Sequence, residues 1–320
     1  MKRFISIAVS VFILSVIYSK IDFPKLIQVF QNCDGWWMVI SLGMVVPLTM
    51  ITAWRLQQLM PPVGTTGSSA LEFGEANRLI LVASVLNMVL PSKMGDIAKA
   101  YFMKERGHLS GSLSLSLVVF EKACDMLSLL LWCVFGLILF PSKDWLFWVM
   151  TGSVVFGFVV GLLLLSSRSF AKLFFATGKA IAPKKLRSKL EKMHVSWLEM
   201  HDYFWHDKFQ LLKITLTSVF IWFLHLLQIW FFILALKAWT PFLANLALSP
   251  LAILAGLLPL TFAGVGTRDA ALIAFYQPYF NAPTAAALGL LCTSRYLLPA
   301  IGGLPFLGQY LGTVRRLRQQ

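Results

Sequence analysis

One interrupted apolar segment organises this chain, and it reads Asn87-Met-Val-Leu-Pro91-Ser-Lys93-Met-Gly95-Asp96-Ile-Ala-Lys99-Ala. The apolar residues 79–90 make about 18 Å of helix at 1.5 Å per residue, which is roughly half of a 30 Å bilayer core. The segment then breaks at Pro91 and Gly95, and Lys93 and Asp96 lie at the break. Ionisable groups near the bilayer centre cost about 2.5 to 3.5 kcal/mol each, so a charged break in such a helix predicts a functional site.

The composition predicts the fold class. Hydrophobic residues make up 58% of the 320 residues and charged residues 13%, which indicates an all-α, polytopic integral membrane helix bundle. The longest polar stretch, about residues 167–213, is too short for a separate soluble domain, so we expect one transmembrane domain over residues 1–320. The net charge of +14 is concentrated in short loops, which favours lipid headgroups over nucleic acid as partner. The four cysteines lack metal-ligand spacing, and no metal or other cofactor is expected.

The distribution of Lys and Arg predicts the topology. We expect six full crossings, over residues 4–19, 36–53, 113–140, 145–165, 214–236 and 283–311. The polar stretch 167–213 carries ten basic and four acidic side chains, so the positive-inside rule places it in the cytoplasm. If residues 79–105 crossed the membrane, the polar stretch 167–213 would face outward. Its cytoplasmic placement therefore requires residues 79–105 to form a re-entrant hairpin, which enters and leaves the membrane on the same side. Both termini are then cytoplasmic, and the membrane is the cell inner membrane.

A second break lies between the apolar pieces 246–260 and 270–279 and reads Pro259-Leu-Thr-Phe-Ala-Gly264-Val-Gly266-Thr-Arg268-Asp269. One net crossing is required between the outer loop at 237–240 and the basic C-terminal end, which predicts a second hairpin that enters from outside. Two opposed broken hairpins are typical of inverted-repeat transporters, whose sites lie where the broken tips meet.

Charged residues at these breaks and in the neighbouring spans are the candidate site. The cations expected to bind a lipid phosphate are Lys93, Arg268 and the mid-span Arg295. The carboxylates expected to balance charge or carry a proton are Asp96, Glu121, Asp125 and Asp269. Turn or hinge positions are predicted at Asn87, Pro91, Gly95, Gly264 and Gly266.

Two structural alternatives remain open for these charges. Glu121 and Asp125 share a helix face, and this face can instead form an ion-pair network that joins the first hairpin to the bundle. Arg295 can instead pair with Asp269 or Glu121. In the polar stretch, we expect a surface amphipathic helix that presents Trp197, Phe204 and Trp205 to the headgroups.

The order of these motifs resembles the lysylphosphatidylglycerol synthase transmembrane-region family, also called the flippase-like domain family, of bacterial and archaeal membrane proteins. The matching blocks, which span nearly the whole chain, are Asn87 with Pro91-Ser-Lys-Met-Gly95-Asp96, Glu121-Lys122-Ala-Cys-Asp125, Gly264-Val-Gly266-Thr-Arg268-Asp269, and Arg295. Asp96 and Asp269 stand where Glu is commoner in the family. The resemblance adds Lys122 to the phosphate-binding candidates, although Lys replaces the usual Arg there and loses bidentate binding.

Sequence and resemblance together predict a flippase-like protein that translocates or binds a phospholipid or a polyprenyl-phosphate-linked sugar in envelope lipid or polysaccharide metabolism. A transporter is favoured over an enzyme, and no catalytic residue is assigned. One alternative is a membrane-embedded transferase with Glu121 or Asp125 as general base. Another is an accessory scaffold for an envelope-assembly enzyme. An envelope glycosyltransferase partner and an oligomer are both compatible with these predictions.

Overall fold

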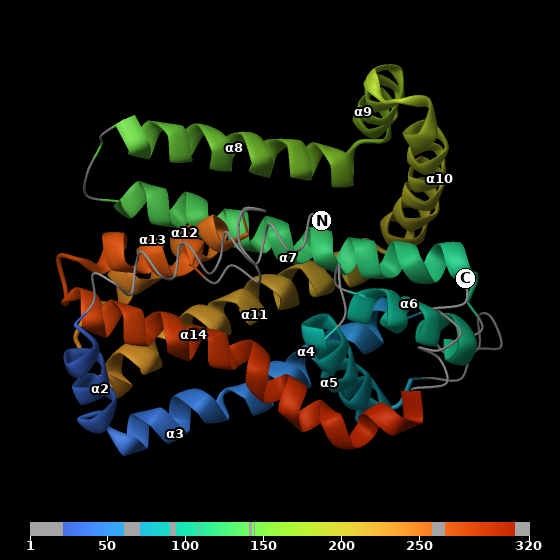
Figure 1. Cartoon of the computed structure of the whole chain (residues 1–320). Coiled ribbons are helices and arrows are strands. Elements are labelled where there is room, and N and C mark those ends of the chain that lie inside the picture. Colours follow the sequence, from blue (N-terminus) through green and yellow to red (C-terminus); the bar gives the residue numbers. More distant parts are fainter. Residues whose placement is uncertain are drawn as a thin grey trace. The chain divides into compact units, whose positions relative to one another are not determined.

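The computed structural model describes residues 22–60, 71–89, 94–107, 109–140, 143, 145–257 and 266–310, and every regular element in these ranges is a helix (Figure 1). This confirms the all-α prediction, while the first predicted crossing, 4–19, lies outside the described residues. The helices are α2 (Phe23–Gln31), α3 (Gly35–Gly43), α4 (Val45–Leu59), α5 (Phe73–Val89), α6 (Met94–Gly107), α7 (Gly111–Leu139), α8 (Trp145–Ser166), α9 (Arg168–Ile181), α10 (Lys184–His206), α11 (Lys208–Ala235), α12 (Phe242–Gly256), α13 (Thr267–Tyr276) and α14 (Ala282–Gly303), which the short 3-10 helix η3 (Leu304–Phe306) follows.

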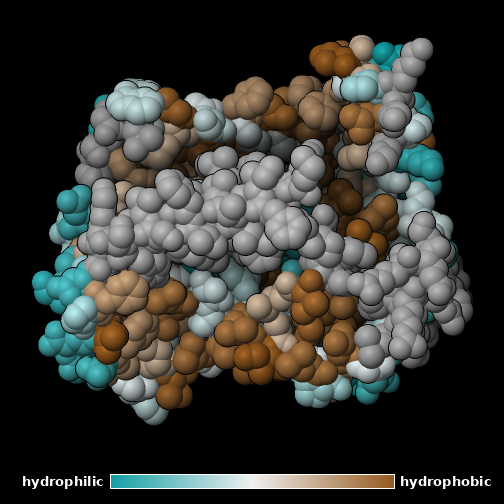
Figure 2. Space-filling model, in the orientation of Figure 1, coloured by the Kyte–Doolittle hydropathy of each residue, from teal (hydrophilic) through white to brown (hydrophobic). Residues whose placement is uncertain are grey.

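Five of the described stretches are long and apolar enough to cross a bilayer. They are Gly35–Leu59, Gly111–Leu139, Phe147–Ser166, Lys208–Ala235 and Ala282–Tyr310, and they coincide with the five predicted crossings that the structure describes. Only 6% of the most apolar window of α8 is buried inside the protein. Figure 2 shows hydrophobic side chains along α8, an arrangement that is stable where lipid surrounds the helix.

The chain folds into two compact units. The first contains Met1–Leu48, Leu129–Val155 and Trp222–Leu298, and the second contains Thr49–Ser128, Phe156–Ile221 and Pro299–Gln320. The long helices α4, α7, α8, α11 and α14 therefore each contribute residues to both units. Each unit contains one pair of shorter helices at a predicted break.

In the second unit, this pair is α5 and α6, which pack against each other (Figure 1). The backbone N–H of Gly95 donates to Asn87 Oδ1 at 3.0 Å. A Cβ atom at Gly95 would overlap the carbonyl oxygen of Ala83, so glycine is what allows α6 to approach α5 this closely. Two predicted turn residues therefore contact each other directly, whereas Pro91 lies outside the described residues.

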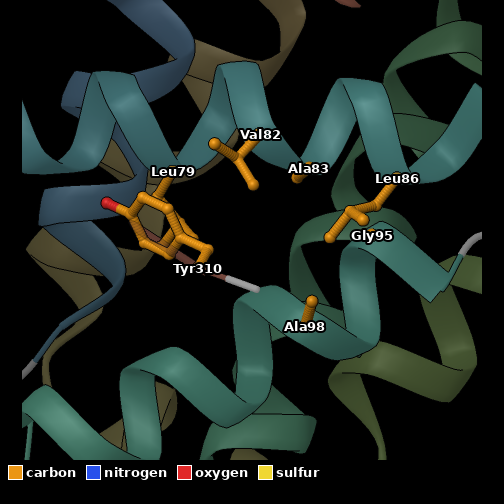
Figure 3. A pocket seen from close by; sticks show the side chains of 7 residues that line it. All are labelled: Leu79, Val82, Ala83, Leu86, Gly95, Ala98 and Tyr310. Carbon is orange, nitrogen blue, oxygen red and sulfur yellow. The ribbon is translucent and has the colours of Figure 1, made fainter. Parts of the chain in front are cut away.

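An apolar hollow of about 10 Å³ lies beside this contact. Figure 3 shows its lining, with Tyr310 approaching from the C-terminal end of the described chain; the remaining lining residues are Leu79, Val82, Ala83, Leu86, Gly95 and Ala98. This volume is close to the minimum that one water molecule requires. The hollow is therefore a packing gap that is too small for a lipid chain.

In the first unit, the shorter pair is α12 and α13, which also pack against each other. A buried network connects them: the Tyr276 hydroxyl donates to Asn245 Oδ1 at 2.9 Å, and the Ser249 hydroxyl lies 2.8 Å from the same phenol oxygen. Asn245 in turn donates to the carbonyl oxygen of Leu226 on α11. These bonds satisfy polar groups that would otherwise be buried without partners.

The polar stretch 167–213 is largely helical and forms α9 and α10, which pack against each other. The expectation that its aromatic residues face lipid headgroups is wrong for Phe204, which is buried and stacks on Phe120 of α7 with ring centroids 3.8 Å apart. Trp205 donates from Nε1 to the carbonyl oxygen of Leu165 at 3.1 Å. The aromatic residues of α10 therefore hold it against the membrane helices of its unit.

Candidate functional site: a buried charge cluster

Six ionisable side chains meet in the second unit, and we call them the charge cluster. Arg55 comes from α4, Asp96 and Lys99 from α6, and Glu121, Lys122 and Asp125 from α7. Three are cations and three are anions, so their formal charges sum to zero. Two of the three helices, α4 and α7, belong to stretches that can cross a membrane. Unpaired charges are energetically most costly inside a bilayer, so the charges on these helices require partners.

Arg55 is the centre of the cluster. Its Nη1 donates to Asp125 Oδ1 at 2.5 Å and to Ser218 Oγ on α11 at 2.9 Å, and its Nη2 donates to Glu121 Oε1 at 2.9 Å. Because Glu121 and Asp125 lie four residues apart on one helix face, the planar guanidinium reaches both carboxylates at once. Arg55 therefore connects α4, α7 and α11.

Lys99 completes the buried part. Its ammonium group binds Glu121 Oε2, so both oxygens of the Glu121 carboxylate are bonded to cations. Arg55, Lys99 and Glu121 are all nearly inaccessible to solvent. Removing one partner of such a pair leaves an uncompensated buried charge and costs about 3 to 5 kcal/mol. This buried triad is consistent with the predicted ion-pair network that joins the first hairpin to the bundle.

Lys122 and Asp96 form the open edge of the cluster. Lys122 Nζ lies 3.4 Å from Asp96 Oδ1 and 3.9 Å from Asp125 Oδ2, and 44% of the Lys122 side chain is exposed. Asp96 lies in the first turn of α6, where unpaired backbone N–H groups favour a negative charge. A partly exposed pair of this kind contributes about 0 to 1 kcal/mol. Lys122 is thus the cation of the cluster that another anion can reach most easily.

A second charged pair lies in the first unit. Arg268 donates from Nε and Nη2 to Asp269 Oδ1 at 3.0 and 2.7 Å, and from Nη2 to the Gly289 carbonyl and Thr293 Oγ1 at 2.9 and 2.8 Å. Asp269 Oδ2 accepts from the backbone N–H of Gly266, whose φ of 107° is in the region that favours glycine. Both side chains are buried, so the pair joins the start of α13 to α14.

The structure brings some of the predicted residues together and not others. Asp96, Glu121, Lys122 and Asp125 meet in the charge cluster, and Arg268 and Asp269 pair in the first unit. Arg295 is half-buried on α14, and its Nε atom has no hydrogen-bond partner among the described residues. The predicted partners of Arg295 bind other cations: Asp269 binds Arg268, and Glu121 binds Arg55 and Lys99. Lys93 and Gly264 lie outside the described residues.

Two members of the cluster were not among the predicted site residues. Arg55 follows Trp54, and this pattern is typical of a span that ends at the headgroups, whereas α4 continues to Leu59 with Ala53 and Leu56 fully buried. Lys99 follows Asp96 by three residues and therefore shares its helix face. The signal for Lys99 was present in the spacing. Within the described residues, no group of three or more His, Cys, Asp or Glu is placed to hold a metal ion.

Comparison with known proteins agrees with the motif resemblance. Residues 3–303 match the family described as the lysylphosphatidylglycerol synthase TM region. The chain belongs to this family. It is also similar to UPF0104 membrane protein MJ1595 of Methanocaldococcus jannaschii, with 21% identity over 323 residues that cover 94% of this chain and 93% of that protein. Family membership and the five long apolar stretches together make this lysylphosphatidylglycerol synthase TM region protein a multi-pass membrane protein.

Proposed function

We propose that this protein translocates, or binds for translocation, a lipid with a phosphate in its headgroup, either a phospholipid or a polyprenyl-phosphate-linked sugar. The observation that carries this proposal is the accessible edge of the charge cluster: Lys122 is 44% exposed, and the ion pairs it forms with described residues are to carboxylates at 3.4 and 3.9 Å. A phosphate oxygen can take the place of the Asp96 carboxylate beside this ammonium group. The buried part of the cluster then keeps the site in shape while the ligand exchanges.

The arrangement of α6 and α7 supports coupling between ligand binding and movement. Two ion pairs of opposite polarity hold these helices together: Asp96 of α6 faces Lys122 of α7, and Lys99 of α6 faces Glu121 of α7. A phosphate at Lys122 removes the weaker pair and leaves the buried pair in place. The proposed consequence is that the tip of the α5 and α6 pair loosens around its Gly95 contact, which opens a polar path for a headgroup.

The remaining predicted residues have secondary roles in this proposal. Lys93 is a further proposed phosphate ligand. Arg295 and Arg268 belong to the first unit and are proposed to bind phosphate independently of the charge cluster, Arg268 only if a phosphate displaces one of its four bonds within the protein. We also propose that the protein resides in the cell inner membrane with its polar stretch in the cytoplasm. The two pairs of shorter helices are then re-entrant. The proposed protein partner is an envelope glycosyltransferase. These assignments rest on charge distribution and on the family.

One observation bears on the transferase alternative. Both carboxylates bind cations through both oxygens: Glu121 binds Arg55 and Lys99, and Asp125 binds Arg55 at 2.5 and 3.3 Å. A general base must also be accessible to its substrate. Glu121 is buried whereas 22% of the Asp125 side chain is exposed, so the role of base would fall to Asp125. The transferase alternative then predicts that Asp125→Asn abolishes formation of a new lipid species.

Transbilayer movement of lipids in proteoliposomes tests the proposal. Fluorescent phosphatidylglycerol, phosphatidylcholine and a short-chain polyprenyl-phosphate sugar are compared for wild type, Lys122→Gln and the control Lys25→Gln, which removes an exposed cation that pairs with Asp22. We expect wild type and Lys25→Gln to move at least one of these lipids, and Lys122→Gln to lose most of that movement while its melting temperature stays near that of wild type. Equal movement by all three proteins contradicts the role of Lys122. No movement by folded wild type contradicts translocation, and mass spectrometry of the lipids then shows whether a new species has formed.

A further inference from the structure

The end of α8 places α9 near a membrane surface. One residue, Ser167, separates the end of the apolar stretch Phe147–Ser166 from the start of α9 at Arg168. Ser167 caps α9 by accepting from the backbone N–H of Phe170 at 3.2 Å. Ser167 has extended backbone angles, and Figure 1 shows that the chain turns there. If α8 crosses the bilayer, the chain leaves the hydrocarbon core at Ser166, so the start of α9 lies at the level of the headgroups.

One face of α9 is already occupied by α10. Ala171 and Phe175 are buried, and the Phe175 ring stacks on His194 with centroids 5.0 Å apart. Lys179 forms an ion pair with Glu191 on the same side. These contacts fix the rotation of α9 about its own axis.

A different face of α9 carries three large apolar side chains that are about half to four-fifths exposed. Leu173 is 64% exposed, Phe174 47% and Ile181 82%. At about 100° per residue these three positions fall within one sector of roughly 100°, which also contains the exposed Thr177, and they form a mainly apolar stripe. Lys172 is exposed and projects about 150° from the centre of this stripe. The part of α9 that does not contact α10 therefore has an apolar side and a basic side.

The charge around the stripe indicates which surface it meets. Residues 168–213 contain ten basic and four acidic side chains, and the exposed bases include Lys172, Arg187 and Lys192. Helices that combine an apolar stripe with a basic polar face bind the boundary between headgroups and acyl chains, and anionic lipid strengthens that binding.

We infer that α9 lies in the membrane–water interface, with Leu173, Phe174 and Ile181 among the acyl chains, and that the net positive charge of the surrounding polar stretch attracts anionic phospholipid headgroups to this surface. This surface is separate from the charge cluster, and the inference does not depend on what the cluster transports. The polar stretch then contacts the membrane through α9. The aromatic residues of α10, which were predicted to make this contact, pack inside the protein instead.

Site-directed fluorescence quenching tests this inference. A fluorophore is attached to a single cysteine introduced at Leu173, Phe174 or Ile181, or at Lys172 as the matched control. Cys33→Ser serves as the background because the other three native cysteines are buried. All four labelled positions are exposed, so their replacement by cysteine removes little packing inside the protein. Each protein is reconstituted with phosphatidylglycerol, and quenching by nitroxides on lipid acyl chains is compared with quenching by aqueous iodide.

We expect the three stripe labels to show a blue-shifted emission, strong quenching by the lipid nitroxide and loss of iodide quenching, with the reverse pattern at position 172. Replacing phosphatidylglycerol by phosphatidylcholine, or adding about 1 M salt to shorten the Debye length to about 3 Å, should reduce the lipid quenching. Equal iodide quenching at all four positions would show that the stripe lies in water. Protection from both quenchers would show that protein covers the stripe, and no response to lipid charge or salt would remove the anionic lipid from the assignment. Each of these three results overturns the inference.

Discussion

Replacement of Glu121 by Gln is the sharpest perturbation of the charge cluster. Gln keeps the size of the side chain and one acceptor oxygen but removes the negative charge that two cations share. In the structure, one carboxylate oxygen accepts from Arg55 at 2.9 Å and the other binds Lys99. Arg55 retains Asp125 and Ser218 after the change, whereas Lys99 loses the carboxylate that neutralises it.

The expected magnitude follows from this difference. Because Lys99 is buried, leaving its charge uncompensated should cost about 3 to 5 kcal/mol of unfolding free energy. Lys99→Met should cost less, about 1.5 to 3 kcal/mol, since Glu121 still binds Arg55. In the double variant Lys99→Met/Glu121→Gln, no unpaired ammonium remains. The two changes should therefore couple favourably by about 0.5 to 3 kcal/mol.

Melting of the purified proteins in one detergent, followed by intrinsic fluorescence, measures these effects. We expect Glu121→Gln to melt well below wild type and the double variant to melt above Glu121→Gln. Glu199→Gln on α10, where the carboxylate is exposed, is the matched control and should melt with wild type. If the double variant shows the sum of the two single effects, Lys99 and Glu121 do not act as a buried pair and the description of the cluster is wrong.

Three further predictions concern packing and pH. Gly95→Ala should destabilise the protein by about 1 to 3 kcal/mol because the added Cβ meets the backbone of Ala83. Gly43→Ala is the control and should not destabilise it, since no atom lies within 4 Å of the added Cβ. Thermal melting compares the two variants. Phe204→Ala should cost about 3 to 5 kcal/mol because its ring is buried against Phe120, and the same melting assay should show almost no change for Phe209→Ala, which is 77% exposed. Burial, with a smaller effect of Arg168, lowers the pKa of His201 below its usual 6.5, so the stability that neutral His201 contributes is complete above pH 6.5 and is lost as the pH falls through its lowered folded-state pKa. The melting temperature of wild type should therefore exceed that of His201→Gln by a margin that shrinks as the pH falls from about 7.5 to about 5. A margin that does not change with pH would exclude this linkage.

The spans and the two breaks could be predicted because each depends on local sequence. Apolar runs of sufficient length predicted the five described crossings, and Pro and Gly close to charged residues marked the places where α5 gives way to α6 and α12 to α13. The shared face of Glu121 and Asp125 also follows from helical periodicity. These features require no knowledge of which helices touch.

The partners of the charged residues could not be predicted in the same way. Arg55 is 66 residues from Glu121 in sequence, and only the tertiary structure brings these two side chains together. Arg268 and Asp269 are adjacent and would not face each other along a regular helix, yet they pair because Asp269 caps the start of α13 at Gly266. Phe204 showed the same limit, since an amphipathic pattern does not tell whether the apolar side meets lipid or protein.

Lipid binding by Asp96→Asn and Lys122→Gln tests the central claim of this account most directly. If a lipid phosphate replaces the Asp96 carboxylate at Lys122, removal of the competing charge should tighten binding of phosphatidylglycerol about two- to fivefold, corresponding to the 0.4 to 1 kcal/mol of a partly exposed pair. Lys122→Gln should weaken binding, so the two variants should move the dissociation constant in opposite directions. Native mass spectrometry of the detergent-solubilised protein, titrated with short-chain phosphatidylglycerol, measures the dissociation constant of each variant. Weaker binding in both variants, or no change in either, would contradict the claim that Lys122 receives the phosphate.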